Sequence, residues 1–318
     1  FPCMGSILPG DRVAFLNVKI VPTPMGGTGL NNSIGPYHVV TIPLARRIVL
    51  NFLELSSWGH YMFGLLEVDV TVARQAMAEY KARTGERLSF TGYLAFCLAR
   101  AVDEDKSVQA YRKGRKQLVL FDDVDVGLMI ERASAGVRAP VGHVLRRANH
   151  KSFVEIHEEI RAVQTMPAPS IKKAPALVQW LPLLPGPLLS LLNALIRMGK
   201  RLNPAGVWVS MVGTVGVTAV GMFGDGGGWG VAAVEHTLCL IVGGISRKPA
   251  VVEGRIEPRE ILNLTVAFDH DIVDGAPAAR FTRRLVELIE SGYGLDEFRT
   301  PDAVAGDAAA IRLEQIPA

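Results

Sequence analysis

A strand, a tight turn and a helix are predicted to follow one another between residues 264 and 291, with a histidine inside the turn. Apolar residues alternate over 264–268, as is typical of a strand. The helix that follows has one apolar face, formed by Phe281, Leu285, Leu288 and Ile289. Asp274 occupies its expected N-cap, so the turn holds His270 rigidly at a strand end. A general base needs that rigidity, although an ordinary turn histidine beside a capping aspartate has the same spacing.

Residues 267–285, AFDHDIVDGAPAARFTRRL, resemble the signature of the dihydrolipoyl acyltransferases of 2-oxoacid dehydrogenase complexes. That signature has a histidine, three further residues and then Asp-Gly, and chloramphenicol acetyltransferase shares it. The resemblance implies that His270 is the general base and that Asp274 belongs to the catalytic turn. One position departs from the family, because Asp271 stands where the family usually has arginine.

A second run, over residues 213–224, resembles the family's Gly-Thr-Phe-Thr-Ile-Ser-Asn-Leu-Gly-Met-Phe-Gly. When the two are aligned on Met222-Phe223-Gly224, the family's hydroxyl residue falls on Thr218. The resemblance therefore implies that Thr218 is the donor to the oxyanion of the reaction. Ser210 is the alternative in another register, which loses the Met-Phe-Gly match.

The resemblance also implies supporting residues. In the resembling enzymes the aspartate of the turn forms a buried ion pair with an arginine from the start of the domain, so Asp274 is expected to pair with Arg46 or Arg47. His60 precedes a predicted strand at a His-Tyr position of the family and is expected to line the substrate channel. No serine–histidine–aspartate or cysteine–histidine order is evident, so direct acyl transfer is expected, without a covalent enzyme intermediate.

The function that the resemblance implies is acyl transfer between coenzyme A and a thiol of the dihydrolipoyl type, or another small acceptor. Coenzyme A or acyl-coenzyme A is then a substrate, and no metal is required. The family's site lies between the subunits of a trimer, which predicts a homotrimer or a multiple of three. We identify no lipoyl domain and no lipoyl-lysine, so a lipoylated protein acting in trans is the expected partner. The alternative is a non-catalytic trimeric core or scaffold of a 2-oxoacid dehydrogenase-like assembly, which Asp271 favours.

The fold that the resemblance implies is an α/β fold of the chloramphenicol acetyltransferase type, a mixed β-sheet flanked by helices. We expect an irregular glycine- and proline-rich arm over 1–40, a catalytic domain over 41–296 and a tail over 297–318. Within the domain, the capping box of Ser152 and Glu155 predicts a helix start. The apolar patterns further predict a strand over 64–70, helices over 71–83 and 91–102, and paired strands over 117–121 and 124–130.

An apolar, proline-broken segment over 166–204 is predicted to be an insertion, because the family has a short polar connection there. Pro185, Gly186 and Pro187 divide it into two pieces, each shorter than the ~20 residues that span a bilayer. A helical hairpin is therefore predicted. We expect the hairpin to pack on its own domain or on a sister subunit. The alternative is a docking or membrane-surface patch, which is favoured by the basic residues that flank the apolar face over 171–201.

The net charge and the cysteines limit the class of protein and the cellular compartment that the sequence allows. The 318-residue chain has 34 basic and 31 acidic residues, and its net charge of +3 does not indicate a nucleic-acid partner. Cys3, Cys97 and Cys239 form neither a disulfide framework nor metal-ligand spacing. No basic segment followed by an apolar one is seen near residue 1. We therefore expect a protein of the reducing cytoplasm.

Overall fold

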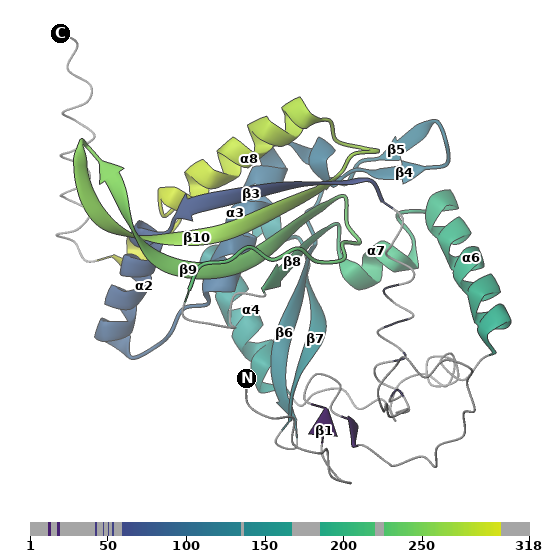
Figure 1. Cartoon of the computed structure of the whole chain (residues 1–318), viewed down its shortest axis with the longest axis horizontal. Helices are drawn as coiled ribbons and strands as arrows, with labels where there is room; N and C mark the ends of the chain where they lie inside the picture. The colour runs from purple at the N-terminus through teal and green to yellow at the C-terminus, as the bar shows by residue number, and fades with distance from the viewer. Residues whose placement is uncertain are drawn as a thin grey trace, which may run out of the picture. The chain divides into compact units, whose positions relative to one another are not determined.

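The computed structural model describes residues 12–13, 18–19, 42, 47, 50, 53, 59–134, 137–166, 185–219 and 226–299. The chain separates into two compact units, one formed by residues 1–55 and 169–194 and the other by residues 56–168 and 195–318. In the first unit, β1 (Arg12–Val13) and β2 (Val18–Lys19) form a short antiparallel pair. The second unit contains the sheet and the turn of His270 (Figure 1).

A six-stranded sheet forms the centre of the second unit, in the order β3-β10-β9-β8-β6-β7. β8 is parallel to its neighbours β6 and β9, and the other pairs are antiparallel, so the sheet is mixed as predicted. The strands are β3 (Tyr61–Asp69), β6 (Val126–Ser134), β7 (Val137–Leu145), β8 (Val215–Ala219), β9 (Leu238–Val252) and β10 (Arg255–Asp269).

Helices cover one face of this sheet (Figure 1). Among them, α3 contacts both α4 and α8 and has 10 of its 15 residues buried, which explains its almost uniformly apolar sequence. The capping box of α4 is present, because Ser152 N donates to Glu155 Oε2 at 2.7 Å and Glu155 N donates to Ser152 Oγ at 3.3 Å. The helices are α2 (Thr71–Thr84), α3 (Phe90–Glu104), α4 (Phe153–Thr165) and α8 (Gly275–Glu290).

The predicted pairing of strands over 117–121 and 124–130 is wrong. β5 (Gln117–Val119) pairs with β4 (Tyr111–Lys113), and β6 pairs with β7 and β8. Gly114, with φ of 63°, lies in the turn between β4 and β5 and allows the chain to reverse there. The apolar pattern indicates strands, but it does not contain the identity of their partners. Short connections complete the unit: η1 (Lys106–Gln109), η2 (Ala148–His150), α7 (Val207–Val212) and η5 (Asp296–Phe298).

Within the predicted insertion, α6 (Gly186–Leu202) begins at the Pro-Gly-Pro break, while the other predicted helix lies outside the described residues. Apolar side chains that recur along α6 at spacings of three and four residues are exposed: Leu188, Leu191, Leu195, Met198 and Leu202. No helix in the described part of the chain has the length and apolar character needed to cross a membrane. The docking or membrane-surface patch stays a prediction.

A glycine-rich loop at 226–230 crosses β9 so closely that no side chain fits between them. A Cβ on Gly243 would lie 2.2 Å from the carbonyl oxygen of Gly228 and 2.5 Å from that of Asn263. Gly228 N also donates to Asn263 Oδ1 at 3.0 Å, and Trp229 Nε1 donates to Leu66 O at 2.9 Å. The loop is therefore held against the sheet by hydrogen bonds, and the glycines of β9 allow its backbone to come this close.

Gly243→Ala should lower the free energy of unfolding by about 1–3 kcal/mol, because the new methyl group collides with backbone atoms that cannot move independently. Gly64→Ala is the matched control within the same sheet, since its Cβ would meet its nearest atom, Val266 O, at 3.8 Å. Chemical denaturation of both variants measures the difference. Equal stability of the two variants would contradict the close approach of the loop.

Candidate active site

The turn that carries His270 is fixed by backbone hydrogen bonds on both sides. β10 and β3 pair over nine residues, and His270 N extends this ladder by donating to His60 O at 2.7 Å. Inside the turn, the N–H groups of Ile272 and Val273 both donate to Asp269 O at 3.0 Å. The backbone therefore has the predicted strand–turn–helix form, and the long β3–β10 register determines where His270 lies.

The imidazole of His270 is 49% exposed, and its Nδ1 lies 3.9 Å from a carboxylate oxygen of Asp274. Asp274 occupies the N-cap of α8, but its side chain makes no capping hydrogen bond. This carboxylate is 87% exposed, so a cation can approach it from outside the turn. Arg46 lies outside the described residues, and Arg47 belongs to the other unit. Their ion pair with Asp274 stays a prediction.

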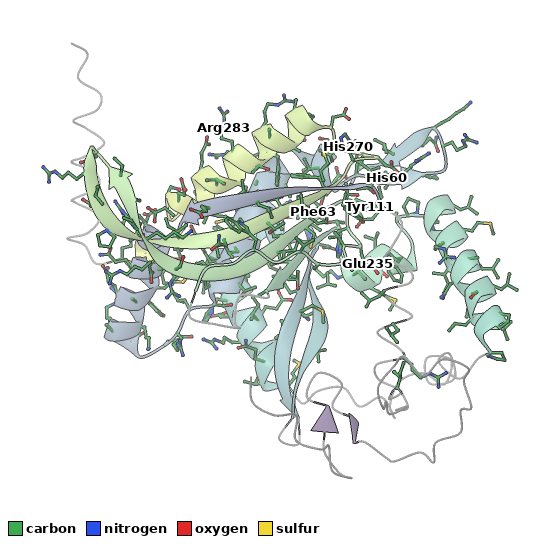
Figure 2. All side chains as sticks on the ribbon, viewed as in Figure 1. His60, Phe63, Tyr111, Glu235, His270 and Arg283 are labelled. Carbon is green, nitrogen blue, oxygen red and sulfur yellow. The ribbon has the colours of Figure 1, made fainter. Side chains whose placement is uncertain are left out.

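Asp271, which replaces the family's arginine, binds two side chains other than His270. Its Oδ1 lies 2.9 Å from His60 Nδ1, and its Oδ2 lies 3.6 Å from Arg112 Nη1. Figure 2 shows that His60, directly before β3, and His270, directly after β10, lie at the same end of these paired strands. The imidazole of His60 is 82% exposed, which is compatible with its predicted position in a substrate channel. Asp271 thus connects the turn to β3 and β4.

Two half-buried tyrosines lie beside the turn and were not predicted as site residues. Tyr61 is the register partner of Asp269, and Tyr111 donates from its hydroxyl to Thr214 O at 3.2 Å. Burial raises the pKa of Tyr61, and the charges of Asp269 and Glu235 raise it further. Burial also raises the pKa of Tyr111, so both hydroxyls remain neutral near pH 7. Tyr61 follows His60 directly, but no sequence signal marks Tyr111 or Glu235.

Thr218 lies on β8, on the sheet face that faces away from the helices. The strand registers place it in one row with Ile241 of β9, Thr265 of β10 and Leu65 of β3. Residues of one row share a face, and Leu65 is exposed on it. Thr218 is two strands away from Thr265, and Thr265 precedes His270 by five residues of chain. The spacing between strands and the rise per residue along β10 together separate Thr218 from His270 by roughly 20 Å. One chain therefore does not bring these two residues together.

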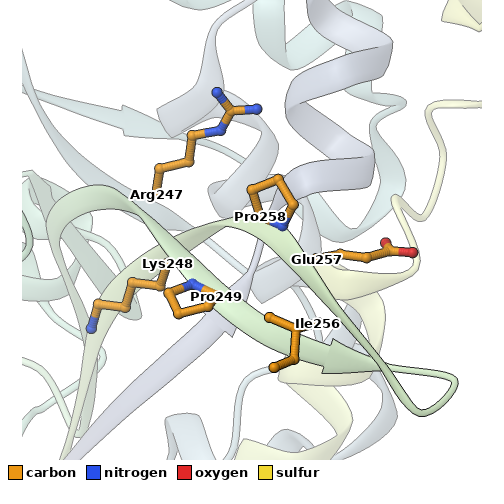
Figure 3. Close-up of a pocket in the computed structure, with 6 residues that line it drawn as sticks. All are labelled: Arg247, Lys248, Pro249, Ile256, Glu257 and Pro258. Atoms are coloured by element: carbon orange, nitrogen blue, oxygen red, sulfur yellow. The ribbon is translucent and has the colours of Figure 1, made fainter.

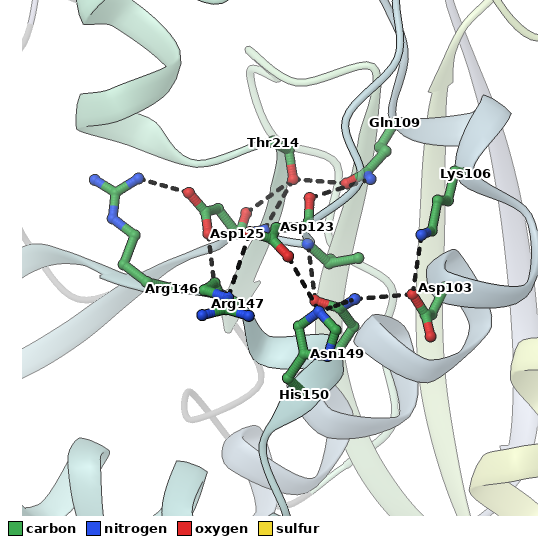
Figure 4. A network of polar contacts seen from close by, with 11 residues as sticks. Asp103, Lys106, Gln109, Asp123, Asp125, Arg146, Arg147, Asn149, His150 and Thr214 are labelled. Carbon is green, nitrogen blue, oxygen red and sulfur yellow. Dashed lines mark hydrogen bonds and ion pairs between the residues drawn. The ribbon is translucent and has the colours of Figure 1, made fainter.

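A polar network anchors the beginning of β8 and thereby sets the position of Thr218 (Figure 4). Thr214 Oγ1 donates to Gln109 Oε1 at 2.7 Å and accepts from Asp125 N at 3.0 Å. The carboxylate of Asp125 in turn accepts from Arg146 Nη1 at 2.7 Å. The network joins β8 to η1, to the start of β6 and to the end of β7.

Ser210, the alternative hydroxyl residue, lies on α7 rather than on a strand. The strand begins only at Val215. Gly213, with φ of 92°, ends α7 and lets the chain enter β8 within two residues, which an L side chain at that position would oppose. The carbonyl of Ser210 accepts a hydrogen bond from Arg146.

An open groove lies near the tip of the β9–β10 hairpin, at the other end of β10 from His270 (Figure 3). It is lined by Arg247, Lys248, Pro249, Ile256, Glu257 and Pro258. Its position along β10 separates it from the catalytic turn, so it is not part of the candidate site. In the described part of the chain, no group of three or more His, Cys, Asp or Glu side chains is arranged to hold a metal ion.

Thr214→Val should lower the free energy of unfolding by about 2–3 kcal/mol, because it leaves Asp125 N and the side-chain oxygen of Gln109 without their partner. Thr84→Val is the control, since Thr84 is exposed and its hydroxyl makes a local bond to Tyr80 O at 2.8 Å. The control should lose less than about 1 kcal/mol. Chemical denaturation measures both, and an equal loss would contradict the anchoring role of the network.

The mixed sheet with helices on one face, and the histidine in the turn after a long strand, define an α/β catalytic domain of the acyltransferase class. A sequence model of the family described as 2-oxoacid dehydrogenases acyltransferase (catalytic domain) matches residues 38–168 and 210–295. The chain belongs to this family. Residues 169–209 lie between the two matched stretches and contain α6, and the predicted insertion stays a prediction.

Individual relatives agree with this assignment. The lipoamide acyltransferase component of the branched-chain alpha-keto acid dehydrogenase complex of Bacillus subtilis is 32% identical over 265 residues, which are 82% of this chain and 54% of the relative. The chain spans about a quarter to about half of the length of the curated relatives that it matches.

Solved structures show the same fold. The dihydrolipoamide acetyltransferase of Azotobacter vinelandii is 18% identical, with a TM-score of 0.58 over 86% of this chain and 99% of that chain. The cubic core of a pyruvate dehydrogenase multienzyme complex is 18% identical, with a TM-score of 0.56 and the same coverage of 86% and 99%. The predicted fold class is confirmed.

Proposed function

We propose that this chain transfers an acyl group directly between coenzyme A and a thiol, of the dihydrolipoyl type or on another small acceptor. The observation that carries the proposal is the half-exposed imidazole of His270, held in a hydrogen-bonded turn at a strand end. Membership of the acyltransferase family supports it, as do relatives named dihydrolipoyllysine-residue succinyltransferase and acetyltransferase. Histidine is the side chain that most often transfers protons near neutral pH.

In the proposed mechanism, His270 takes the proton from the acceptor thiol, and the sulfur attacks the carbonyl carbon of the acyl thioester. The carbonyl oxygen becomes an oxyanion, to which the hydroxyl of Thr218 donates a hydrogen bond. The bond between that carbon and the sulfur of coenzyme A then breaks. The protonated imidazole returns its proton to the departing sulfur, so the enzyme ends as it began. Because Nδ1 faces Asp274, Nε2 is the nitrogen that moves the proton.

Residue spacing supports Thr218 over Ser210. The description of the Azotobacter vinelandii enzyme names a serine, a histidine and an asparagine in its catalytic mechanism, with 52 residues from serine to histidine and four from histidine to asparagine. Thr218 and His270 are also 52 residues apart, and His270 and Asp274 are four apart. Ser210 would be 60 residues from His270 and lies on a helix.

The proposed mechanism requires more than one copy of the chain. Thr218 and His270 must both contact one tetrahedral centre, yet they are separated by roughly 20 Å within a chain. We therefore place the hydroxyl and the imidazole of each site on different copies of a homotrimer, or of a multiple of three. Exposed Phe63 and Leu65 on edge strand β3 support such an interface. A lipoylated protein acting in trans would supply the dihydrolipoyl thiol.

His270→Ala should lower the rate of transfer from acetyl-coenzyme A to dihydrolipoamide by roughly 10²–10⁴-fold, because it removes the base. Thr218→Val should lower kcat by roughly 10²–10³-fold with little change in the Kd for coenzyme A, because the hydroxyl acts on charge that develops in the transition state. Thr218→Ser should restore most of the rate. A spectrophotometric thiol assay measures all three variants.

His143→Gln is the control for these variants, because His143 lies on β7, at the opposite edge of the sheet from β3, where it pairs with Glu159 of α4. It should transfer the acyl group at the parental rate. If an active acyl substrate is found and His270→Ala is as fast as the parent, the mechanism is wrong. A folded trimer that transfers nothing would instead support the non-catalytic core.

Light scattering at micromolar concentration should give three times the mass of one chain, or a multiple of three. Replacing Phe63 and Leu65 by serine together should shift the protein toward monomer, because the pair presents apolar surface on an edge strand. Leu118→Ser is the control, since Leu118 is equally exposed but lies on β5, outside the six-stranded sheet. A monomeric parent that still transfers acyl groups would contradict the shared site.

A further inference from the structure

The β4–β5 hairpin holds the highest local density of positive charge in the sequence, and the proposed mechanism does not use it. No other window of five residues contains four basic side chains. We call these four residues the basic tip. They are all exposed at the end of the hairpin: Arg112, Lys113, Arg115 and Lys116.

The hairpin is anchored firmly at its base. The ring of Tyr111 packs edge-on against Phe121, with ring centroids 5.8 Å apart. The hydroxyl of Tyr111 donates to Thr214 O at 3.2 Å, and Thr237 Oγ1 donates to Ala110 O at 2.5 Å. The base of the hairpin is therefore part of the packed core, and only its charged end projects into solvent.

Most of the charge of the basic tip is not neutralised by neighbouring side chains. Arg112 lies 3.6 Å from Asp271. Among the described residues, no carboxylate lies within ion-pair distance of the other three members. Asp123 follows the hairpin closely in the sequence, but it is already paired with Arg147 and His150. Within the described part of the chain, three members of the basic tip therefore have no acidic partner, and Arg112 is partly compensated.

The basic tip lies next to the candidate active site. The contact between Arg112 and Asp271 joins the hairpin to the residue that follows His270. Figure 1 shows β4 and β5 beside the start of β3 and the turn after β10. The same contact gives a role to the position at which this chain departs from the family. The carboxylate of Asp271 holds the first arginine of the hairpin against the turn, which an arginine at this position would repel.

We propose that the basic tip binds the phosphate groups of coenzyme A while the pantetheine arm of that substrate reaches His270. This inference rests on the proposed function. The pyrophosphate and the 3′-phosphate carry about four negative charges near pH 7, comparable to the charge of the basic tip. Arginine forms bidentate hydrogen bonds with phosphate, and lysine acts as a point charge.

The reach of the substrate agrees with this placement. The pantetheine arm spans on the order of 15 Å between its sulfur and the pyrophosphate when it is extended. Two residues of strand and one extended basic side chain carry the end of the hairpin on the order of 10–15 Å beyond Arg112. A sulfur beside His270 therefore leaves the phosphates within reach of Arg115 and Lys116.

The test compares coenzyme A with pantetheine, which has the arm without the phosphates. In calorimetry, the double variant Arg115→Gln/Lys116→Gln should raise the Kd for coenzyme A about tenfold and leave that for pantetheine unchanged. Added salt should weaken coenzyme A binding more in the parent than in the variant. Arg247→Gln/Lys248→Gln on the β9–β10 hairpin is the control, because it removes the same charge at the other end of β10 and should change neither Kd.

Two results would overturn the inference: an unchanged Kd for coenzyme A in the hairpin variant, or an equal loss for coenzyme A and pantetheine. Adenosine 3′,5′-bisphosphate serves as a second probe, and it should bind the parent more tightly than the hairpin variant. Failure of the proposed function has a different signature. There, the parent would transfer no acyl group from acetyl-coenzyme A or acetyl-pantetheine, or His270→Ala would retain the parental rate.

Discussion

The pairing of β3 with β10 is the constraint on which the candidate site depends. Nine paired residues fix the register, and the bond from His270 N to His60 O continues it into the turn. A slip of one residue would move every side chain of β10 to the opposite face and carry the histidine away from the sheet edge. The position of His270 is thus determined by the paired length of β3 and β10 rather than by the few residues of the turn.

The same sheet separates the two chemical groups of the proposed mechanism. β8 lies two strands from β10, and the network around Thr214 and Asp125 holds it in register with β6 and β9. A rigid sheet cannot bend by the roughly 20 Å that separates Thr218 from His270. A site that uses both groups therefore requires association of chains, and the exposed apolar residues of β3 lie on the face where association would bury them.

Local features were readable from the sequence because neighbours along the chain create them. The capping box at Ser152 and Glu155 has both predicted hydrogen bonds, and the turn of His270 has the predicted form. Other features depended on distant partners and were missed. β5 pairs with β4 through the turn at Gly114, and Tyr111 lies beside the turn of His270 without any sequence signal.

The sequence by itself determined the strand–turn–helix around His270, the family signature and the boundaries of most helices, since hydrophobic periodicity and capping act over a few residues. Only the tertiary structure decided which strands are neighbours, where Asp271 directs its carboxylate, and how far Thr218 lies from His270. Those outcomes depend on strand register and on contacts between residues far apart in the chain, such as His60 and Asp271, which are 211 positions apart. Spacing along the chain contains no information about such contacts, because register and packing set them only when the whole sheet has formed.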